Sequence, residues 1–176
     1  MLIRDMNRQM SLDLVSEIQF GRIACAHGAQ PYVTPFSFAY HEGFIYSFAT
    51  IGRKVEWMRT NPLVCVEVEK IASRREWKTA VIFGQFEELN DSREPINLRK
   101  FAHDLLAQTA MWWEPGAIKT PRWGVERKLE AVYFRISIDE ITGHQGFADA
   151  SAAESGSRET AARQAPVGER GRPRKR

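Results

Sequence analysis

Residue types suited to phosphate binding follow a strand-like segment in the first third of the chain. Thr50 carries a hydroxyl, and Arg53 and Lys54 place two cations directly after Gly52. A short helix is expected next, ending just before Pro62, because proline disfavours helical backbone in its predecessor. Free N–H groups in the first turn of that helix, the hydroxyl and both cations would converge on one anion. These residues therefore predict a phosphate site.

A bare Gly-Arg-Lys turn is also compatible with a solvated surface turn, and the segment before it is what favours a binding site. Residues 30–40 are strand-like with prolines near their start, a short His-Glu-Gly turn follows at 41–43, and a second strand-like run leads into the cationic turn. The order of a proline-containing strand, a turn, a strand and a cationic turn makes the pattern more specific than any one piece.

Hydrophobic periodicity predicts a mainly β chain with flanking helices. One helix is expected at 12–19 with Ser11 as its N-cap, and a longer one is expected to start at 92–95. Short turns imply antiparallel pairing and closure of the sheet, and Gly84 is expected to mark a bend. The predicted strands are 21–27, 32–40, 44–49, 64–69, 77–89 and 131–141.

Together these features resemble the flavin-binding split-barrel family related to pyridoxamine 5'-phosphate oxidase, in its nitroimidazole-resistance-type branch. The resemblance runs from about residue 20 to residue 143. It rests on the order and spacing of motifs at 21–24, 31–35, 52–54, 61–65, 77, 84 and 140–143. It implies an antiparallel six-stranded split β-barrel of the flavin-binding type, mainly β with flanking helices, in one domain at 1–146.

The resemblance also implies FMN as the cofactor. Backbone groups of an extended segment can hydrogen-bond the heteroatoms of a flavin ring, although Pro35 and Phe36 would equally suit packing inside a barrel. The residues expected to hold FMN are Val33, Thr34, Pro35 and Phe36 along the isoalloxazine ring, and Ala49, Thr50, Arg53 and Lys54 toward the phosphate.

Members of this family usually form a homodimer in which the fifth strand of one subunit reaches the flavin of the other. Trp77, Lys78 and Thr79 occupy that region here. Because neighbouring strand residues point to opposite faces, only one of Lys78 and Thr79 can accompany Trp77, and we favour Trp77 with Thr79. A solvated lysine and an aromatic residue at a dimer seam are the alternative, which also predicts a homodimer.

Two differences from the family argue against two activities known from its members. Phe48 stands where many nitroimidazole-resistance-type relatives carry a histidine, and the carboxyl end has no Arg-rich pyridoxal-phosphate site. Neither nitroimidazole reduction nor pyridoxamine 5'-phosphate oxidation is therefore expected. Trp112 and Trp113 plug a core edge or form a substrate lid, and the sequence leaves both readings open. No residue is predicted to be catalytic.

Charge divides the chain into a neutral body and a basic tail. Of 25 Lys and Arg and 22 Asp and Glu, residues 147–176 hold seven and four, which leaves 18 of each sign in 1–146. Because 147–176 has almost no large apolar residue, it is predicted to be a disordered basic tail. Nucleic acid binding is not favoured, since no basic surface with interleaved aromatic residues accompanies the tail.

Neither a membrane segment nor a metal site is predicted. No run approaches the ~20 apolar residues of a membrane span, and the start has no apolar run long enough for a secretory signal, so a cytoplasmic protein is expected. Cys25 and Cys65 are expected to be reduced core cysteines. The four histidines lack metal-ligand spacing with Cys, Asp or Glu.

Three functions remain open. The leading one is an FMN-dependent oxidoreductase that passes hydride or electrons between NADH or NADPH and a small acceptor, because a flavin needs no protein nucleophile for that chemistry. A deazaflavin in place of FMN is an alternative within this class. The second function is a non-catalytic flavin-binding carrier or sensor, and the third is an interaction protein whose tail contacts nucleic acid.

Overall fold

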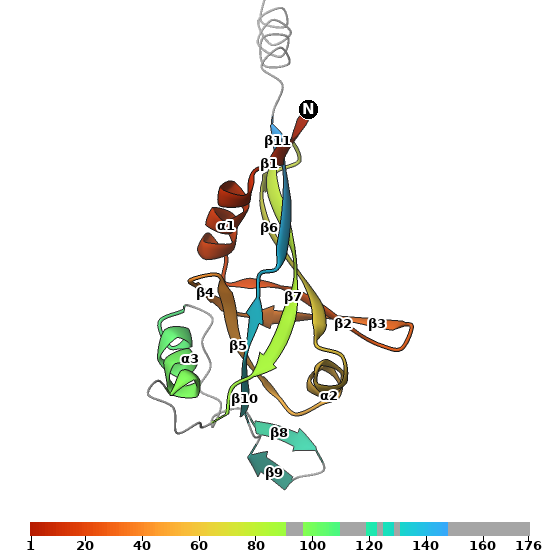
Figure 1. Cartoon of the computed structure of the whole chain (residues 1–176), viewed down its shortest axis with the longest axis vertical. Helices are drawn as coiled ribbons and strands as arrows, with labels where there is room; N and C mark the ends of the chain where they lie inside the picture. Colours follow the sequence, from red (N-terminus) through yellow and green to blue (C-terminus); the bar gives the residue numbers. More distant parts are fainter. Residues whose placement is uncertain (91–96, 110–118, 123–124, 129–130, 148–176) are drawn as a thin grey trace, which may run out of the picture.

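The structure, a computed structural model, describes residues 1–90, 97–109, 119–122, 125–128 and 131–147, and it is an antiparallel β protein flanked by helices (Figure 1). The helices are α1 (Arg8–Glu17), α2 (Arg53–Thr60) and α3 (Leu98–Leu106). The strands are β1 (Leu2–Met6), β2 (Phe20–His27), β3 (Gln30–Ser37), β4 (Ala39–His41), β5 (Phe44–Thr50), β6 (Leu63–Ser73), β7 (Glu76–Glu88), β8 (Lys119–Arg122), β9 (Val125–Lys128), β10 (Ala131–Ser137) and β11 (Glu140–Phe147).

The sheet divides around β7. The strand order is β3-β2-β6-β7-β10-β5-β4, while β11 pairs with both β7 and β1, and β8 and β9 pair with each other. β11 follows β7 from Trp77 to Phe83, and β10 takes over at Phe86. A Cβ atom on Gly84 would lie 1.8 Å from the carbonyl oxygen of Ser137, so glycine allows the close approach at which the two partners change over. This split is what defines the barrel.

The predicted split barrel is confirmed, but its strand number is wrong, because the sheet has nine strands where the sequence predicts six. The predicted strand at 32–40 is interrupted at Phe38, whose N–H donates to the carbonyl of Gln19. The predicted strand at 131–141 divides at Asp139, whose N–H donates to the carbonyl of Phe83. β1 is the third addition, and it pairs only with β11 at the far end of the chain.

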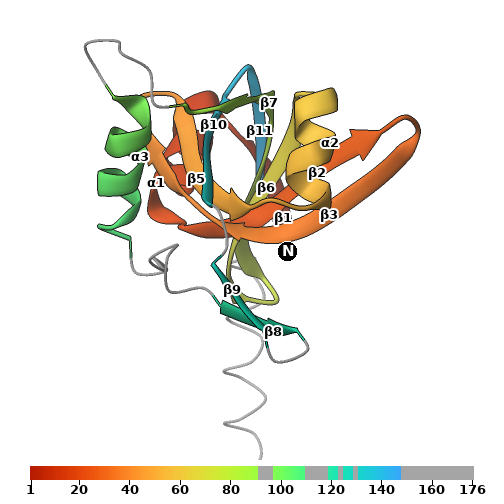
Figure 2. The same ribbon diagram turned by 90° about the horizontal axis from the view of Figure 1, so that it is seen from below.

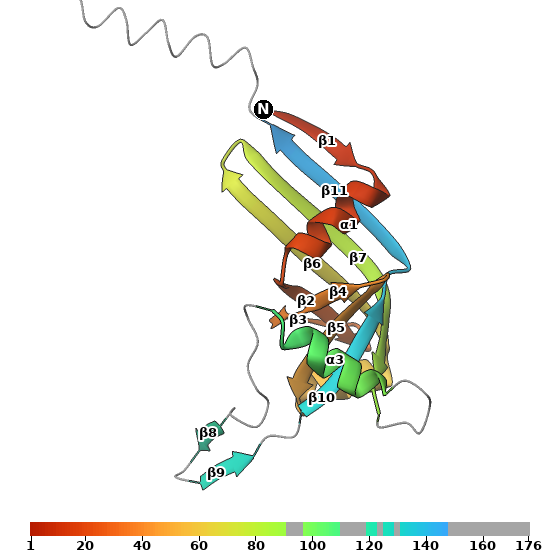
Figure 3. The same ribbon diagram turned by 90° about the vertical axis from the view of Figure 1, so that its left-hand side faces the viewer.

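The helices cover the two halves of the sheet (Figure 3). α1 packs against β11 and β7, and α3 packs against β10 and β5. α1 begins four residues earlier than predicted, because Asn7 rather than Ser11 is its N-cap, and the Ser11 hydroxyl is buried and donates to the carbonyl of Asn7. α3 follows Asn97, and the predicted start at 92–95 lies outside the described residues.

The core lies inside the barrel, and a smaller cluster lies under α3. The alternation predicted for 64–69 is confirmed, since Val64, Val66 and Val68 are buried and the residues between them are half-buried on the outer face. Cys25 and Cys65 are both free thiols, but only Cys25 is in the core, because Cys65 belongs to that outer face.

The carboxyl-terminal strand extends one residue beyond the predicted domain end, because Phe147 pairs with Leu2 as the last residue of β11. The predicted tail from 148 onward and the Trp112-Trp113 pair lie outside the described residues. None of the described helices has the length and apolar character needed to span a bilayer.

Candidate functional site

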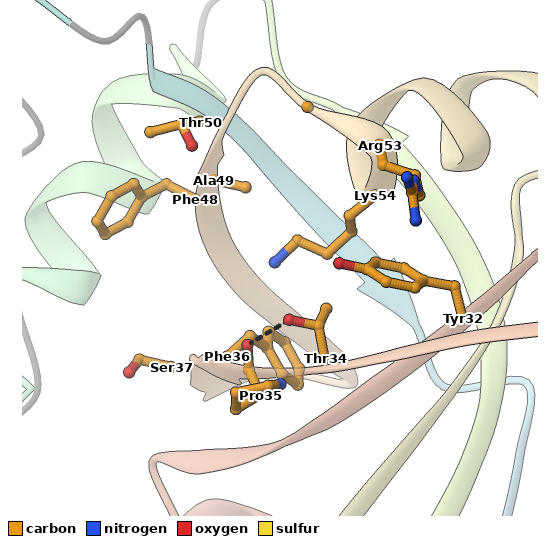
Figure 4. A pocket seen from close by; sticks show the side chains of 11 residues that line it. Tyr32, Thr34, Pro35, Phe36, Ser37, Phe48, Ala49, Thr50, Arg53 and Lys54 are labelled. Atoms are coloured by element: carbon orange, nitrogen blue, oxygen red, sulfur yellow. Dashed lines mark hydrogen bonds between the residues drawn. The ribbon is translucent and has the colours of Figure 1, made fainter. Parts of the chain in front are cut away.

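A pocket of about 380 Å³ opens between β3, β5 and the start of α2 (Figure 4). The strands supply its walls, and the turn from β5 into α2 closes one end. Its lining residues are Tyr32, Thr34, Pro35, Phe36, Ser37, Phe48, Ala49, Thr50, Gly52, Arg53 and Lys54. The segments that the sequence singles out for phosphate and ring therefore border the same space.

The amino-terminal end of α2 differs from that of the other described helices. Asn7 and Asn97 cap α1 and α3, each accepting a hydrogen bond from a first-turn N–H group. α2 has Gly52 at this position and no side-chain cap. Its first-turn N–H groups have no partner within the helix, so they are available to an anion in the pocket.

Gly52 has an extended backbone and not the left-handed conformation for which glycine is usually needed. Its φ is 175° and its ψ is −176°, which is extended backbone open to any residue. A Cβ atom at this position would lie 4.0 Å from the Thr50 carbonyl oxygen, the nearest heavy atom outside its chain neighbours. The absence of a side chain here leaves the helix start open to the pocket.

Two cations border this end of the pocket. The Lys54 ammonium points into the pocket, and the Arg53 guanidinium lies over the Tyr32 ring, 5.7 Å from its centre (Figure 4). Within the described ranges, neither cation forms an ion pair with a carboxylate. Burial lowers the pKa of Lys54, and this outweighs the opposite effect of the negative charge on a Cys25 thiolate. A bound anion would supply the half-buried Lys54 ammonium with the counter-charge that none of the described carboxylates provides.

The other end of the pocket combines apolar surface with polar atoms on β3. Phe36 is buried and stacks on Phe38 with ring centres 5.3 Å apart. The Ser37 carbonyl accepts a hydrogen bond of 2.7 Å from the Ser47 hydroxyl. Among the described residues, the Ser37 hydroxyl is the buried side-chain oxygen that has no hydrogen-bond partner. A ligand with polar atoms on its rim fits this end, since it would satisfy that oxygen.

The structure brings seven of the ten predicted site residues together around the pocket. These are Thr34, Pro35, Phe36, Ala49, Thr50, Arg53 and Lys54. Val33 does not line the pocket, and its side chain is 58% exposed. Whether the seven contact a cofactor stays a prediction.

Four lining residues are missing from the predicted set: Tyr32, Ser37, Phe48 and Gly52. Tyr32 could have been found, because it lies two residues before Thr34 and therefore on the same strand face. Ser37 and Phe48 become neighbours of the pocket only through the approach of β3 to β5, which the sequence does not specify.

Trp77 and Thr79 lie on the half of β7 that pairs with β11, away from this pocket. Trp77 is half-buried, and its indole nitrogen would be 2.5 Å from a Cβ atom on Gly146. It lines a separate pocket of about 180 Å³ together with Lys78 and Gln145. Trp77 and Thr79 are predicted to contact the flavin of a second subunit, and this contact stays a prediction.

The strand order and the divided sheet place the chain among the split β-barrel proteins. A sequence model of the pyridoxamine 5'-phosphate oxidase family matches residues 7–145, so the chain belongs to that family. The resemblance drawn from the sequence is thereby confirmed.

The chain is also similar to individual proteins of other bacteria. An uncharacterized protein of Rhizobium meliloti (strain 1021) is 33% identical over 143 residues, which cover 81% of this chain and 95% of that protein. The crystal structure of a FAD-binding protein of Mesorhizobium loti is 36% identical, with a TM-score of 0.68 over 83% of this chain and 99% of the other. A structure from Bacteroides thetaiotaomicron assigned to 5-nitroimidazole antibiotic resistance shares the fold alone, at 15% identity and a TM-score of 0.58 over 82% and 89%.

Proposed function

We propose that the pocket binds a flavin, with FMN as the unit that fills it. The observation that carries the proposal is the uncapped start of α2, with Lys54 and Arg53 beside it, at one end of a pocket of about 380 Å³. Support comes from the Mesorhizobium loti relative, which is described as FAD-binding and is 36% identical. FAD contains the FMN unit, so one pocket could serve for both.

The residues divide between the two parts of the cofactor. The first-turn N–H groups of α2, the Thr50 hydroxyl and the two cations would hold the phosphate. Thr34, Pro35 and Phe36 would flank the ring, and the Ser37 hydroxyl would hydrogen-bond to its rim. Ala49 is buried and small, so it leaves room between these two parts.

We propose further that the protein is an oxidoreductase that passes hydride or electrons from NADH or NADPH to a small acceptor. A bound flavin supplies reversible hydride and electron transfer. No histidine or carboxylate is among the pocket-lining residues that the structure describes. The protein would therefore bind and orient the cofactor rather than supply acid or base catalysis.

A flavin carrier or sensor without turnover is the second candidate, and the same lack of an acid or base at the pocket favours it. Anaerobic addition of NADH and NADPH to the flavin-loaded protein separates the two. Bleaching of the flavin absorbance near 450 nm supports the oxidoreductase. Bound flavin that stays oxidised with both coenzymes contradicts it and supports the carrier. Mass spectrometry of the released cofactor distinguishes FMN from a deazaflavin.

A homodimer is part of the proposal, because a row of apolar side chains crosses the outer face of the sheet. Cross-strand pairing aligns Val33, Ala24, Cys65 and Phe83 in one row across β3, β2, β6 and β7. Val33 and Phe83 are 58% and 48% exposed. Such a row fits a twofold interface, the commonest closed assembly.

Light scattering tests the dimer directly. We expect twice the mass of one chain, and we expect Phe83→Glu to yield monomers because it places a carboxylate in the apolar row. A wild-type monomer with full flavin occupancy would exclude both the dimer and the contribution of Trp77 and Thr79 to a neighbouring site.

A cytoplasmic location is also proposed, since the free thiols of Cys25 and Cys65 suit a reducing compartment.

A further inference from the structure

A series of aromatic side chains begins where the phosphate end of the pocket stops. Tyr32 lines the pocket beneath Arg53, and Trp57, one turn further along α2, meets the Tyr32 ring edge-on with centres 5.7 Å apart. The His27 ring lies against Trp57, also at 5.7 Å, with 30° between their planes. We call Tyr32, Trp57 and His27 the aromatic wall.

Two elements that project together from the barrel position this wall. His27 and Tyr32 are on the β2–β3 hairpin, which extends beside α2 (Figure 2). On the helix, Arg53 and Trp57 are four residues apart and therefore share the face that meets the hairpin. Tyr32 and Trp57 pack one side against the core and are half-buried, while His27 and Arg53 are exposed. The wall is therefore rigidly supported and reachable from solvent.

The composition of the wall suits a nucleobase. Bases stack on aromatic side chains and on the plane of an arginine guanidinium, and such stacking tolerates any base because each has a π face. FMN ends at its phosphate, which the proposed function places beside Arg53. A cofactor that continues beyond this phosphate with a second nucleotide would pass Arg53 and reach the wall.

We propose that the aromatic wall binds the adenosine half of flavin adenine dinucleotide, with Arg53 contacting the second phosphate. The inference rests on the proposed flavin site. It adds that this chain prefers a flavin dinucleotide to FMN, and it assigns that preference to Trp57 and His27, which do not line the pocket itself.

Parallel titrations of FMN and FAD against the full chain test the inference through flavin fluorescence. The wild type should bind FAD at least ten times more tightly than FMN. Trp57→Leu keeps an apolar side chain against the core but removes the aromatic face, so the FAD preference should fall below threefold while FMN affinity stays within twofold. His27→Ala, on an exposed hairpin residue, should lower the preference by a smaller factor. Phe20→Leu, an exposed aromatic at the opposite end of β2, is the matched control and should change neither affinity.

The outcomes separate the inference from the proposed function. Equal wild-type affinities for the two flavins, or variants that weaken both ligands by the same factor, overturn the aromatic wall and leave the FMN site standing. Absence of binding by either flavin overturns the proposed function and the inference together. If Trp57→Leu does not fold, as judged by circular dichroism, the His27→Ala comparison decides.

Discussion

The amino-terminal ends of α1 and α2 differ in how their free backbone N–H groups are satisfied. In α1, the Asn7 side chain accepts a hydrogen bond of 2.8 Å from the Met10 N–H. In α2, Gly52 stands at the capping position and provides no side-chain acceptor. A side-chain cap is worth about 1 kcal/mol relative to alanine but only a few tenths relative to glycine, so Gly52 leaves the first-turn donors free at a small cost in stability.

The position of α2 indicates which kind of group would accept hydrogen bonds from its free N–H groups. α2 starts at the pocket with the half-buried Lys54 ammonium beside it, whereas the first turn of α1 donates to its own Asn7 side chain. A phosphate would accept hydrogen bonds from the free first-turn donors and would give Lys54, which has no carboxylate partner among the described residues, a counter-charge. The difference between the two helices therefore indicates a site kept open for an anionic ligand.

Removing both cations should have the largest effect on FMN affinity, because it removes the charged contacts to the phosphate. Each charge-assisted contact is worth about 1.5–3 kcal/mol, so Arg53→Ala with Lys54→Ala should weaken FMN binding at least about 100-fold. Riboflavin lacks the phosphate and should change by less than about threefold on the same basis. Isothermal titration of both ligands against both proteins measures the difference.

Arg59→Ala is the matched control for this variant, because it removes a cation from the same helix at the end that pairs with Glu88. It should leave both affinities unchanged. If the double variant weakens FMN and riboflavin equally, the two cations support the fold rather than bind phosphate. Unchanged FMN affinity would remove the cationic turn from the site.

Giving α2 a side-chain cap, as α1 has, tests whether its free N–H groups bind the phosphate. Gly52→Asp has space for its Cβ and places a carboxylate near the first-turn donors. We expect a slightly higher melting temperature for the free protein and an FMN affinity lower by about tenfold, with riboflavin affected far less. A variant that gains stability and still binds FMN like the wild type would show that the donors are not used by the phosphate.

The ratio of FMN to riboflavin affinity should fall as the pH rises from 7 to 10. Because burial lowers the pKa of Lys54, its ammonium loses a proton at a lower pH than an exposed lysine does. The FMN phosphate is already doubly ionised above about pH 6, so its charge stays constant over this range. Lys54→Met should flatten the profile; a profile that stays equally steep in this variant would assign the titration to another group.

Removing the cap of α1 should affect stability alone, which makes it the smallest expected effect on ligand binding. Asn7→Ala leaves the Met10 N–H without its acceptor and should cost about 1 kcal/mol, or about 2–4 °C in melting temperature. The ratio of the two ligand affinities should stay at the wild-type value. A change in that ratio would mean that the two helix starts are coupled.

The same two regions show what could be predicted from the sequence. The cationic turn is local, so residues 50–54 identify it without knowledge of the fold. The Ser37 hydroxyl and Phe48 join the pocket only through packing of β3 against β5, a contact that periodicity does not encode. β1 was beyond prediction for a similar reason, because four of its five residues are exposed and its partner β11 lies at the other end of the fold.

Flavin uptake by the purified full chain tests the central claim most directly. The protein is incubated with excess FMN or FAD, freed of unbound ligand by gel filtration and denatured, and the released flavin is quantified by absorbance and identified by mass spectrometry. The account predicts about one phosphate-bearing flavin per chain, with much lower retention of riboflavin. A chain that retains neither FMN nor FAD, or that retains riboflavin equally well, would contradict it.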